Sequence, residues 1–150
     1  AASTLNNLGL NLSKMEKYEE ALDVLQEALV LKERLDGVDS KAVAHTLQTL
    51  SHTQLADGQL HEARTSAERS LRIMETHFYE DDPTLYATVL AQNAQVLCDI
   101  GGEANLNRAT NLMNQCIAIE IQHFGATDPL TGQNLLMLLM AIQAKQEEEK

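Results

Sequence analysis

The sequence predicts an all-α protein of three helix–turn–helix pairs and one terminal helix, seven antiparallel helices in all. Leu, Ala, Gln and Glu are abundant among the 150 residues, whereas the β-branched and aromatic residues that favour strands are sparse. Apolar residues recur at the spacing of amphipathic helices. The pattern of residues 4–29 also returns 42 residues later, which indicates an internal repeat of helices.

The first pair occupies residues 1–36. Leu5, Leu8 and Leu12 fall on one face of a helix, and the stretch SKMEK that follows is typical of a polar turn. Gly9 lies beside this stripe, where a missing side chain lets another backbone approach closely. The second helix carries its own stripe, formed by Tyr18, Ala21, Leu22, Leu25, Ala28 and Leu29.

The second pair, over residues 39–79, repeats the first with a shift of 42. Leu47 and Leu50 continue the first stripe, and Ser51 takes the position of Gly9. The turn is ADGQ, and the second stripe consists of Leu60, Ala63, Ala67 and Leu71.

The third pair, over residues 83–124, needs a shift of 43 in its first helix and 46 in its second, because its turn, IGGEANLN, is enlarged. Ala94 takes the small-residue position, and Asn93 falls where the second pair has Leu50. The apolar stripes consist of Leu90, Leu97, Leu106, Ala109, Met113 and Ile117.

The linkers between the pairs carry helix-start signals. Asp39, Asp82 and Asp128 are expected as N-caps, and Pro83 and Pro129 suit a first helical position. A terminal helix is expected over 129–147. Together these elements predict one domain over 1–150, which we expect to be a piece of a longer protein, so that any targeting signal would lie outside it.

The repeat resembles the tetratricopeptide repeat, a helix–turn–helix unit with small residues at fixed places. The likeness is carried by LNNLG with YEEAL in the first pair and by LQTLS with LHEAR in the second. The 42-residue spacing and the acidic-Pro linkers resemble the subset found in kinesin light chains. The resemblance implies an α-solenoid in which pairs stack through small residues, here Gly9, Ser51, Ala94, Ala21, Ala63 and Ala109.

The resemblance also implies a peptide-binding site, because the first helix of each pair lines the concave side of such a solenoid. The implied residues are Asn6, Asn7, Leu10, Ser13, Lys14, His45, Gln48, Thr49, His52, Leu55, Thr88, Gln92, Gln95 and Asp99. Their amides can pair with the backbone of an extended peptide. The alternative is that these polar side chains are only solvated. Lys14 is the only basic member, which disfavours the carboxylate clamp of chaperone-binding relatives.

The formal net charge of −11 disfavours nucleic acid and anionic membranes as partners. No stretch of about 20 apolar residues is present, so we expect no membrane insertion. The expected partner is a protein or peptide of neutral to basic character, whose association the net charge should accelerate. The acidic runs EDD and EEE are typical of solvated linkers and tails.

We predict no enzyme activity, metal or cofactor. His45 and His52 lie seven residues apart on one helix, about 10 Å along its axis, too far to share a metal ion. Cys98 and Cys116 fall on helical stripes, where a buried thiol behaves as a small apolar group. Because the two cysteines form no disulfide framework, we expect an intracellular, cytoplasmic location, and an organelle interior stays open because a targeting signal would lie outside this sequence.

The terminal helix is apolar nearly all round, whereas a capping helix should have one polar face. We expect Leu136, Leu139 and Met140 to pack on the third pair. The remaining apolar residues of this helix are expected to form an interface for further repeats, a second copy or a partner. The alternative is a normally covered surface that is exposed only because the sequence is a piece of a longer protein. The interface residues are Leu135, Met137, Leu138 and Ile142. The leading function is therefore peptide or adaptor binding in the groove, and the alternative is a self-association or scaffold segment.

Overall fold

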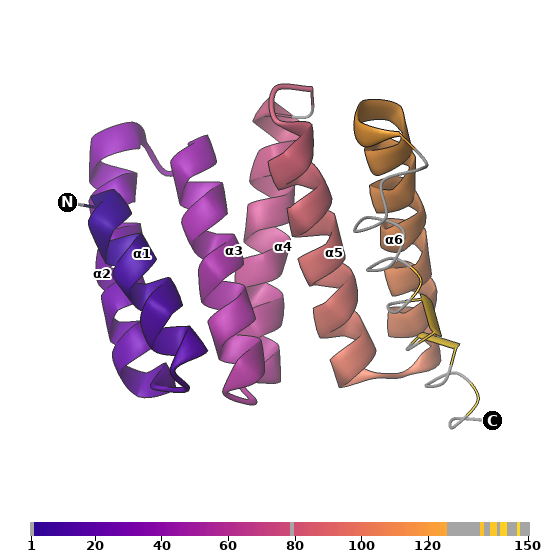
Figure 1. The fold of residues 1–150 in the computed structure, drawn as a ribbon, viewed down its shortest axis with the longest axis horizontal. Coiled ribbons are helices and arrows are strands. Elements are labelled where there is room, and N and C mark those ends of the chain that lie inside the picture. The colour runs from indigo at the N-terminus through magenta and orange to yellow at the C-terminus, as the bar shows by residue number, and fades with distance from the viewer. Residues whose placement is uncertain are drawn as a thin grey trace. The chain divides into compact units, whose positions relative to one another are not determined.

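The structure is a computed structural model that describes residues 2–78 and 80–125, together with Leu136, Leu139, Met140, Ile142, Gln143 and Glu147. These described residues contain six α-helices and no strand (Figure 1). The helices are α1 (Ala2–Lys14), α2 (Tyr18–Asp36), α3 (Lys41–Ala56), α4 (Leu60–His77), α5 (Pro83–Ile100) and α6 (Glu103–Phe124). Their bounds lie within the three predicted pairs. The six isolated residues are helical as well, and the rest of the predicted seventh helix lies outside the described residues.

The contacts divide the chain into two compact units, Ala1–Phe78 and Tyr79–Lys150. In the first unit α1 packs on α2, α3 packs on α4, and α2 also packs on α3. In the second unit α5 packs on α6. The first two predicted pairs therefore form one packed body, and each unit is described here by itself.

The helix starts follow from local capping, with one correction. Asp82 caps α5 as predicted, because its carboxylate accepts a hydrogen bond from the Leu85 amide at 3.1 Å and Pro83 follows it. The predicted cap Asp39 is wrong: the Ser40 hydroxyl accepts from the Val43 amide at 3.1 Å and starts α3. Aspartate and serine are both favoured N-cap residues, so residue type alone does not indicate whether Asp39 or Ser40 caps the helix. Asp128 lies outside the described residues.

The two turns inside the first unit have the same geometry. Glu16 follows α1 with a φ of 61°, and Gly58 follows α3 at the equivalent position with a φ of 82°. In each turn the next residue donates to the carbonyl five residues earlier, at 2.9 Å from Lys17 and 2.8 Å from Gln59. Glycine adopts this left-handed backbone without steric cost, whereas a glutamate does not. The first turn is therefore the more strained of the two.

The predicted small residues are all buried, and at Gly9 the structure also shows a close approach of two helices. A Cβ on Gly9 would lie only 2.6 Å from Cγ of Leu25, so α1 and α2 approach through the missing side chain. The matching Ala21 and Ala63 are fully buried. In the other pairs, Ser51 and Ala94 are also fully buried, as is Ala109.

Hydrogen bonds donated by buried serine side chains join α3 to α4. The Ser51 hydroxyl donates to the Ala63 carbonyl at 2.8 Å, and the Ser66 hydroxyl donates to Oε1 of Gln54 at 2.8 Å. All of these groups are buried and partnered, which is the condition for placing polar atoms in a core. The corresponding contact in the first pair, by the 42-residue shift, would join apolar Leu12 and Val24.

One cross-helix hydrogen bond recurs in the second and third pairs. The Ser70 hydroxyl donates to the Ala44 carbonyl at 2.7 Å, and the Cys116 thiol donates to the Ala87 carbonyl at 3.4 Å. The acceptors are 43 residues apart and the donors 46, which are the shifts found for the two helices of the third pair. Cys116 is therefore the structural equivalent of Ser70.

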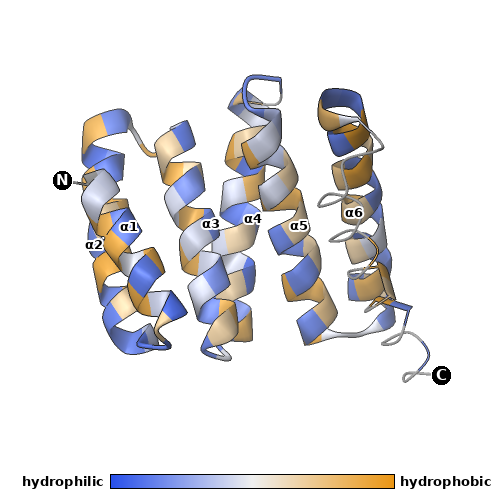
Figure 2. Cartoon of the chain, in the orientation of Figure 1, coloured by the Kyte–Doolittle hydropathy of each residue, from blue (hydrophilic) through white to orange (hydrophobic). Residues whose placement is uncertain are grey.

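The predicted stripe on α1 needs a correction. Leu5 and Leu12 are half-buried, but Leu8 is 46% exposed, whereas its equivalent Leu50 is 2% exposed. The colouring of α1 by hydropathy shows apolar segments that are not confined to the side facing α2 (Figure 2). Leu8 is exposed because none of the described helices of the first unit packs against that side of α1. Asn93, at the same repeat position, is 3% exposed, with its amide donating to the Val89 carbonyl at 2.9 Å.

Candidate functional site

The predicted binding residues of the first unit lie on two neighbouring helices that contact each other, α1 and α3. We call this surface the α1–α3 face, defined by Asn6, Asn7, Leu10, Ser13, Lys14, His45, Gln48, Thr49, His52 and Leu55. Four of its members are exposed, namely Asn7, Lys14, His45 and His52. Leu10, Gln48 and Leu55 are half-buried, and Asn6, Ser13 and Thr49 are buried.

The predicted residues of α5 belong to the second unit and are described separately. Gln92 is 8% exposed, Gln95 is half-buried, and Thr88 and Asp99 are exposed. The Gln95 amide donates to Asp99 at 3.0 Å, and the Thr88 hydroxyl donates to the Thr84 carbonyl at 2.9 Å. These hydrogen bonds within α5 already use side-chain polar atoms that the sequence analysis assigned to ligand binding.

Asn6 is the polar residue of the α1–α3 face whose environment is most unusual. It is 4% exposed, and its side-chain oxygen Oδ1 is buried without a hydrogen-bond partner among the described residues. In contrast, the buried Thr49 hydroxyl donates to the His45 carbonyl at 3.2 Å. In the second unit, Nε2 of Gln92 is also buried without a partner. A buried acceptor without a donor costs about 1–3 kcal/mol, so such atoms in native proteins call for an explanation.

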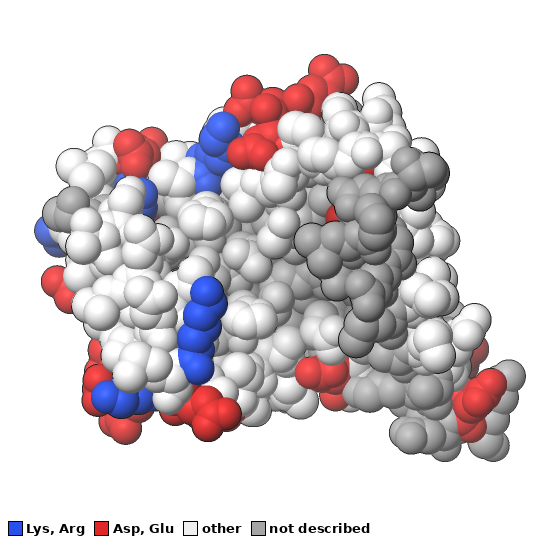
Figure 3. All heavy atoms as spheres, in the orientation of Figure 1, with Lys and Arg blue, Asp and Glu red and all other residues white. Residues whose placement is uncertain are grey.

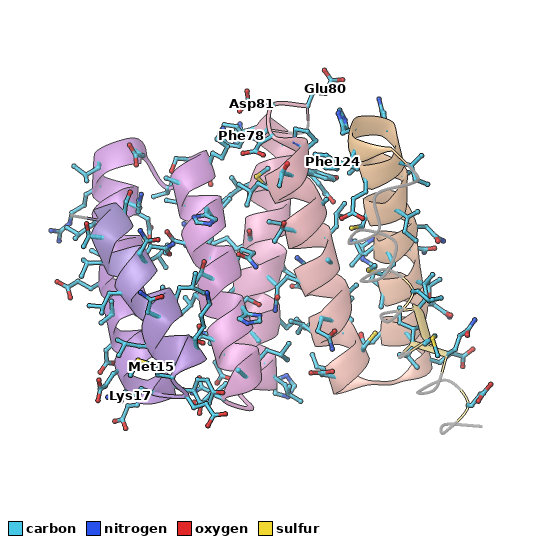
Figure 4. All side chains as sticks on the ribbon, in the orientation of Figure 1. Met15, Lys17, Phe78, Glu80, Asp81 and Phe124 are labelled. Atoms are coloured by element: carbon cyan, nitrogen blue, oxygen red, sulfur yellow. The ribbon has the colours of Figure 1, made fainter. Side chains whose placement is uncertain are left out.

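Charge is scarce on the α1–α3 face. Helix α1 contains no acidic residue, and Lys14 in its last turn is its only charged side chain. In Figure 3, uncharged atoms prevail over α1 and α3, and acidic side chains gather toward the helix ends. Figure 4 shows Met15 and Lys17 at the turn between α1 and α2, at one end of this face. The acidic surplus of the chain therefore lies mainly outside the predicted site.

A hollow that the sequence did not indicate lies near the last turns of α4. It has a volume of about 370 Å³ and is lined by Asp39, Arg69, Arg72, Ile73, Thr76 and His77. The Arg69 guanidinium donates to the Val38 carbonyl at 2.9 Å and lies 3.5 Å from the Glu33 carboxylate. The lining residues of α4 follow the i, i+3, i+4 and i+7 spacing, from which the sequence could have predicted that they share a helix face. This spacing does not predict that the face is hollowed. Its mixed charge favours no ligand class.

The described residues that could act as a nucleophile or bind a metal ion lie in environments that disfavour these roles. Burial, with the Glu120 carboxylate as the second cause, raises the pKa of Cys116 from 9.0 to about 12. The reactive thiolate is therefore disfavoured at neutral pH. Within the described part of the chain, no three His, Cys, Asp or Glu side chains come together as a metal site. Nor does any described helix have the length and apolar character to cross a membrane.

The structure corrects the predicted sides of the terminal helix where it describes them. Leu136 and Met140, expected to pack on the third pair, are 60% and 59% exposed. Ile142, expected on the open interface, is 2% exposed, and Leu139 is half-buried. A segment that is apolar nearly all round gives no periodicity from which to choose the buried side. The other predicted interface residues, Leu135, Met137 and Leu138, lie outside the described residues.

Comparison with known proteins identifies the repeat. The tetratricopeptide repeat family matches residues 1–76, which is half of the chain. Two crystal structures of nearly identical TPR-like repeats, from a Podosopora anserina protein described as a kinesin light chain, are similar in fold. The first has 17% identity and a TM-score of 0.78, covering 97% of this chain and 68% of that one. The second has 15% identity and a TM-score of 0.75, covering 97% and 75%.

No curated protein matches the sequence. At these identities the solved structures establish the fold alone. The family match rests on the first two helix pairs, where the small residues and the apolar stripes recur with the same spacing. The chain belongs to the tetratricopeptide repeat family.

Proposed function

We propose that the chain is a protein-interaction module whose α1–α3 face binds an extended peptide segment of a partner. Tetratricopeptide repeats in general mediate protein–protein interaction, and the peptide and its position are the new part of this proposal. The observation that carries it is the buried Oδ1 of Asn6, which has no partner among the described residues. Asn6 is only 4% exposed, so its side chain must rotate toward the surface before an amide N–H of a peptide backbone can supply the missing donor.

The surroundings of Asn6 suit a peptide main chain. Asn7 on α1 and Gln48 on α3 carry further amide groups, and Leu10 and Leu55 are half-buried apolar side chains of the same two helices. Amides can bind any peptide backbone, and the leucines would favour apolar side chains of the ligand. Because α1 carries no acidic residue, the ligand meets little charge at the face itself.

The net charge supports a neutral to basic ligand. At −11, the chain attracts a basic partner at long range, although most of the acids lie away from the face. Electrostatic steering acts on the association rate and is screened by salt. We expect the association rate to fall between low and physiological ionic strength while the dissociation rate changes little. An association rate indifferent to salt would contradict this part of the proposal.

The first experiment compares partners captured from a cell lysate by the chain and by Asn6→Ala/Asn7→Ala/Gln48→Ala. A matched control replaces three exposed amides of α6, Asn107, Asn111 and Asn114, by alanine. Thermal melts must show all three proteins equally folded. We expect the face variant alone to lose partners, which can then be mapped to a peptide and measured by calorimetry. Partners retained by the face variant would place the site elsewhere.

Asn6→Leu separates binding from stability. Replacing the amide by an apolar group of similar size removes the unpaired acceptor, so the free energy of unfolding should rise or stay unchanged. Peptide affinity should nevertheless fall. A stability loss without any effect on affinity would indicate that Asn6 is a structural residue.

A second candidate function is self-association through the terminal segment. It is favoured by Leu136 and Met140, two helical residues four positions apart that are both about 60% exposed. Light scattering of the chain across concentration, with Leu136→Glu/Met140→Glu as the dissociating variant, tests it. A mass of one chain at all concentrations would exclude this candidate.

A further inference from the structure

The hollow near the last turns of α4 has a mixed charge that by itself indicates no ligand, but its charged groups are not equally available. Arg69 is already neutralised, because its guanidinium donates to the Val38 carbonyl at 2.9 Å and lies 3.5 Å from the Glu33 carboxylate. Arg72 and Asp39 line the same hollow, yet neither makes a hydrogen bond or an ion pair with the described residues, including each other. Arg72 and Asp39 are therefore available to a ligand as one cation and one anion.

The walls of the hollow are held by contacts within the first unit. Arg69 ties the segment between α2 and α3 to α4, and the Ser70 hydroxyl donates to the Ala44 carbonyl near the start of α3 at 2.7 Å. Ile73 is 4% exposed and forms an apolar part of the lining. The volume of about 370 Å³ lies within the range of about 300–1,000 Å³ that is typical of small-molecule sites.

Neither a simple anion nor a simple cation suits this arrangement. An anion at Arg72 would meet the Asp39 carboxylate, the carbonyl end of α4 and the net charge of −11. A cation at Asp39 would meet the Arg72 guanidinium. A zwitterion can pair each of its charges with the opposite one, and the net charge of the chain does not repel it because it is neutral overall.

We propose that this hollow binds a free α-amino acid with an apolar side chain. Its ammonium group would pair with Asp39, its carboxylate with the Arg72 guanidinium, and its side chain would contact Ile73. Ammonium and carboxylate are attached to the same carbon of the ligand, so it can bridge two residues that do not contact each other. The Thr76 hydroxyl, which also lines the hollow and makes no hydrogen bond with the described residues, is a further donor for the carboxylate.

The test is a titration of the isotope-labelled 150-residue chain with L-leucine, followed through its amide NMR resonances. We expect saturable shifts at residues 38–40 and 72–77, which surround the hollow. N-acetyl-leucine lacks the ammonium group and leucinamide lacks the carboxylate. Each should bind at least about fivefold more weakly than leucine, because each loses one charge-assisted hydrogen bond.

Two variants remove the charged partners, and a third is their control. Asp39→Asn and Arg72→Gln should each weaken leucine binding at least about fivefold. Both side chains are exposed and Asp39 does not cap α3, so thermal melts should show both variants folded. Arg64→Gln removes another arginine of α4, whose partner is Glu68 at 2.9 Å, and should leave the affinity for leucine unchanged.

The absence of saturable binding up to the solubility limit of leucine would overturn the proposal. Equal binding of N-acetyl-leucine or leucinamide would do so as well, as would an affinity that is unchanged in Asp39→Asn and Arg72→Gln. None of the lining residues belongs to the α1–α3 face, so Asn6→Ala/Asn7→Ala/Gln48→Ala should bind leucine as the original chain does. The two proposals therefore fail independently.

Discussion

The first two helix pairs share one repeat pattern but are held together by different chemistry. At the crossing of α1 and α2 the contact is apolar, and Gly9 is so close to Leu25 that no side chain fits there. Between α3 and α4 the same position is Ser51, which fits and also donates to the Ala63 carbonyl at 2.8 Å. The comparison shows that the repeat constrains side-chain size at the helix crossing more strictly than polarity. A small polar residue is accepted where its hydrogen bond is made.

The largest effect is expected for Gly9→Ala. The added Cβ would meet Leu25 at 2.6 Å, so the buried leucine must leave its place. Overpacking of about 1–3 kcal/mol is offset by a gain in helix propensity of about 1 kcal/mol, so stability falls by up to about 2 kcal/mol. Urea unfolding measures the change. Adding Leu25→Val should recover part of it, and a double mutant no better than the sum of the singles would refute the contact.

The polar contact between α3 and α4 is tested with Gln54 and Ser66. Ser66→Val removes the donor at 2.8 Å and leaves the buried Gln54 oxygen unpaired, at a cost of about 1–2 kcal/mol. Gln54→Leu/Ser66→Val recreates the residue types of Leu12 and Val24 in the first pair and should return stability to within about 0.5 kcal/mol. A double-mutant cycle in urea gives the coupling energy. Strictly additive single effects would mean that this hydrogen bond contributes nothing.

The turns of the two pairs offer a stabilising change. Glu16 has a φ of 61° where the second pair has Gly58. Glu16→Gly relieves the left-handed strain of about 1 kcal/mol, and the greater freedom of glycine in the unfolded chain offsets part of this gain. We expect an increase of about 0.5 kcal/mol in the free energy of unfolding, with no change in circular dichroism. Glu16→Ala serves as the control and should give no increase.

The smallest effect at neutral pH is expected for Cys116→Ser, which gives the third pair the donor that Ser70 provides in the second. The fold raises the pKa of Cys116 from 9.0 to about 12. Above pH 9 the unfolded chain loses this proton while the folded chain keeps it, so stability declines as the pH rises toward 12. The serine variant should lose less stability over this range. Parallel pH profiles would show that Cys116 does not contribute.

Much of the fold followed from the sequence because it depends on local and repeated features. The helix pairs, their turns and the buried positions Ala21, Ala63 and Ala109 were predicted from periodicity and spacing, and the structure confirms them. The 3.6-residue repeat of apolar side chains determines which residues can share a face. Small residues at a fixed position indicate where two backbones approach.

The candidate site was less predictable, because accessibility depends on neighbouring helices. The sequence placed Asn6 and Asn7 together among ligand contacts, yet Asn6 is buried and Asn7 is exposed. Thr49 was predicted to contact a ligand, but its hydroxyl donates a hydrogen bond within α3. Which polar atoms stay unpaired follows from rotamers and packing, which no residue pattern specifies.

Leu8 and Leu50 show which properties of a residue the sequence determines and which depend on the tertiary structure. The sequence determined that both are helical, that they occupy the same repeat position and that they lie beside a small residue. Only the tertiary structure determined that Leu50 is 2% exposed and Leu8 46%, since burial requires a second surface. Helix formation and amphipathicity are properties of a segment, whereas burial is a property of the neighbours that pack against it.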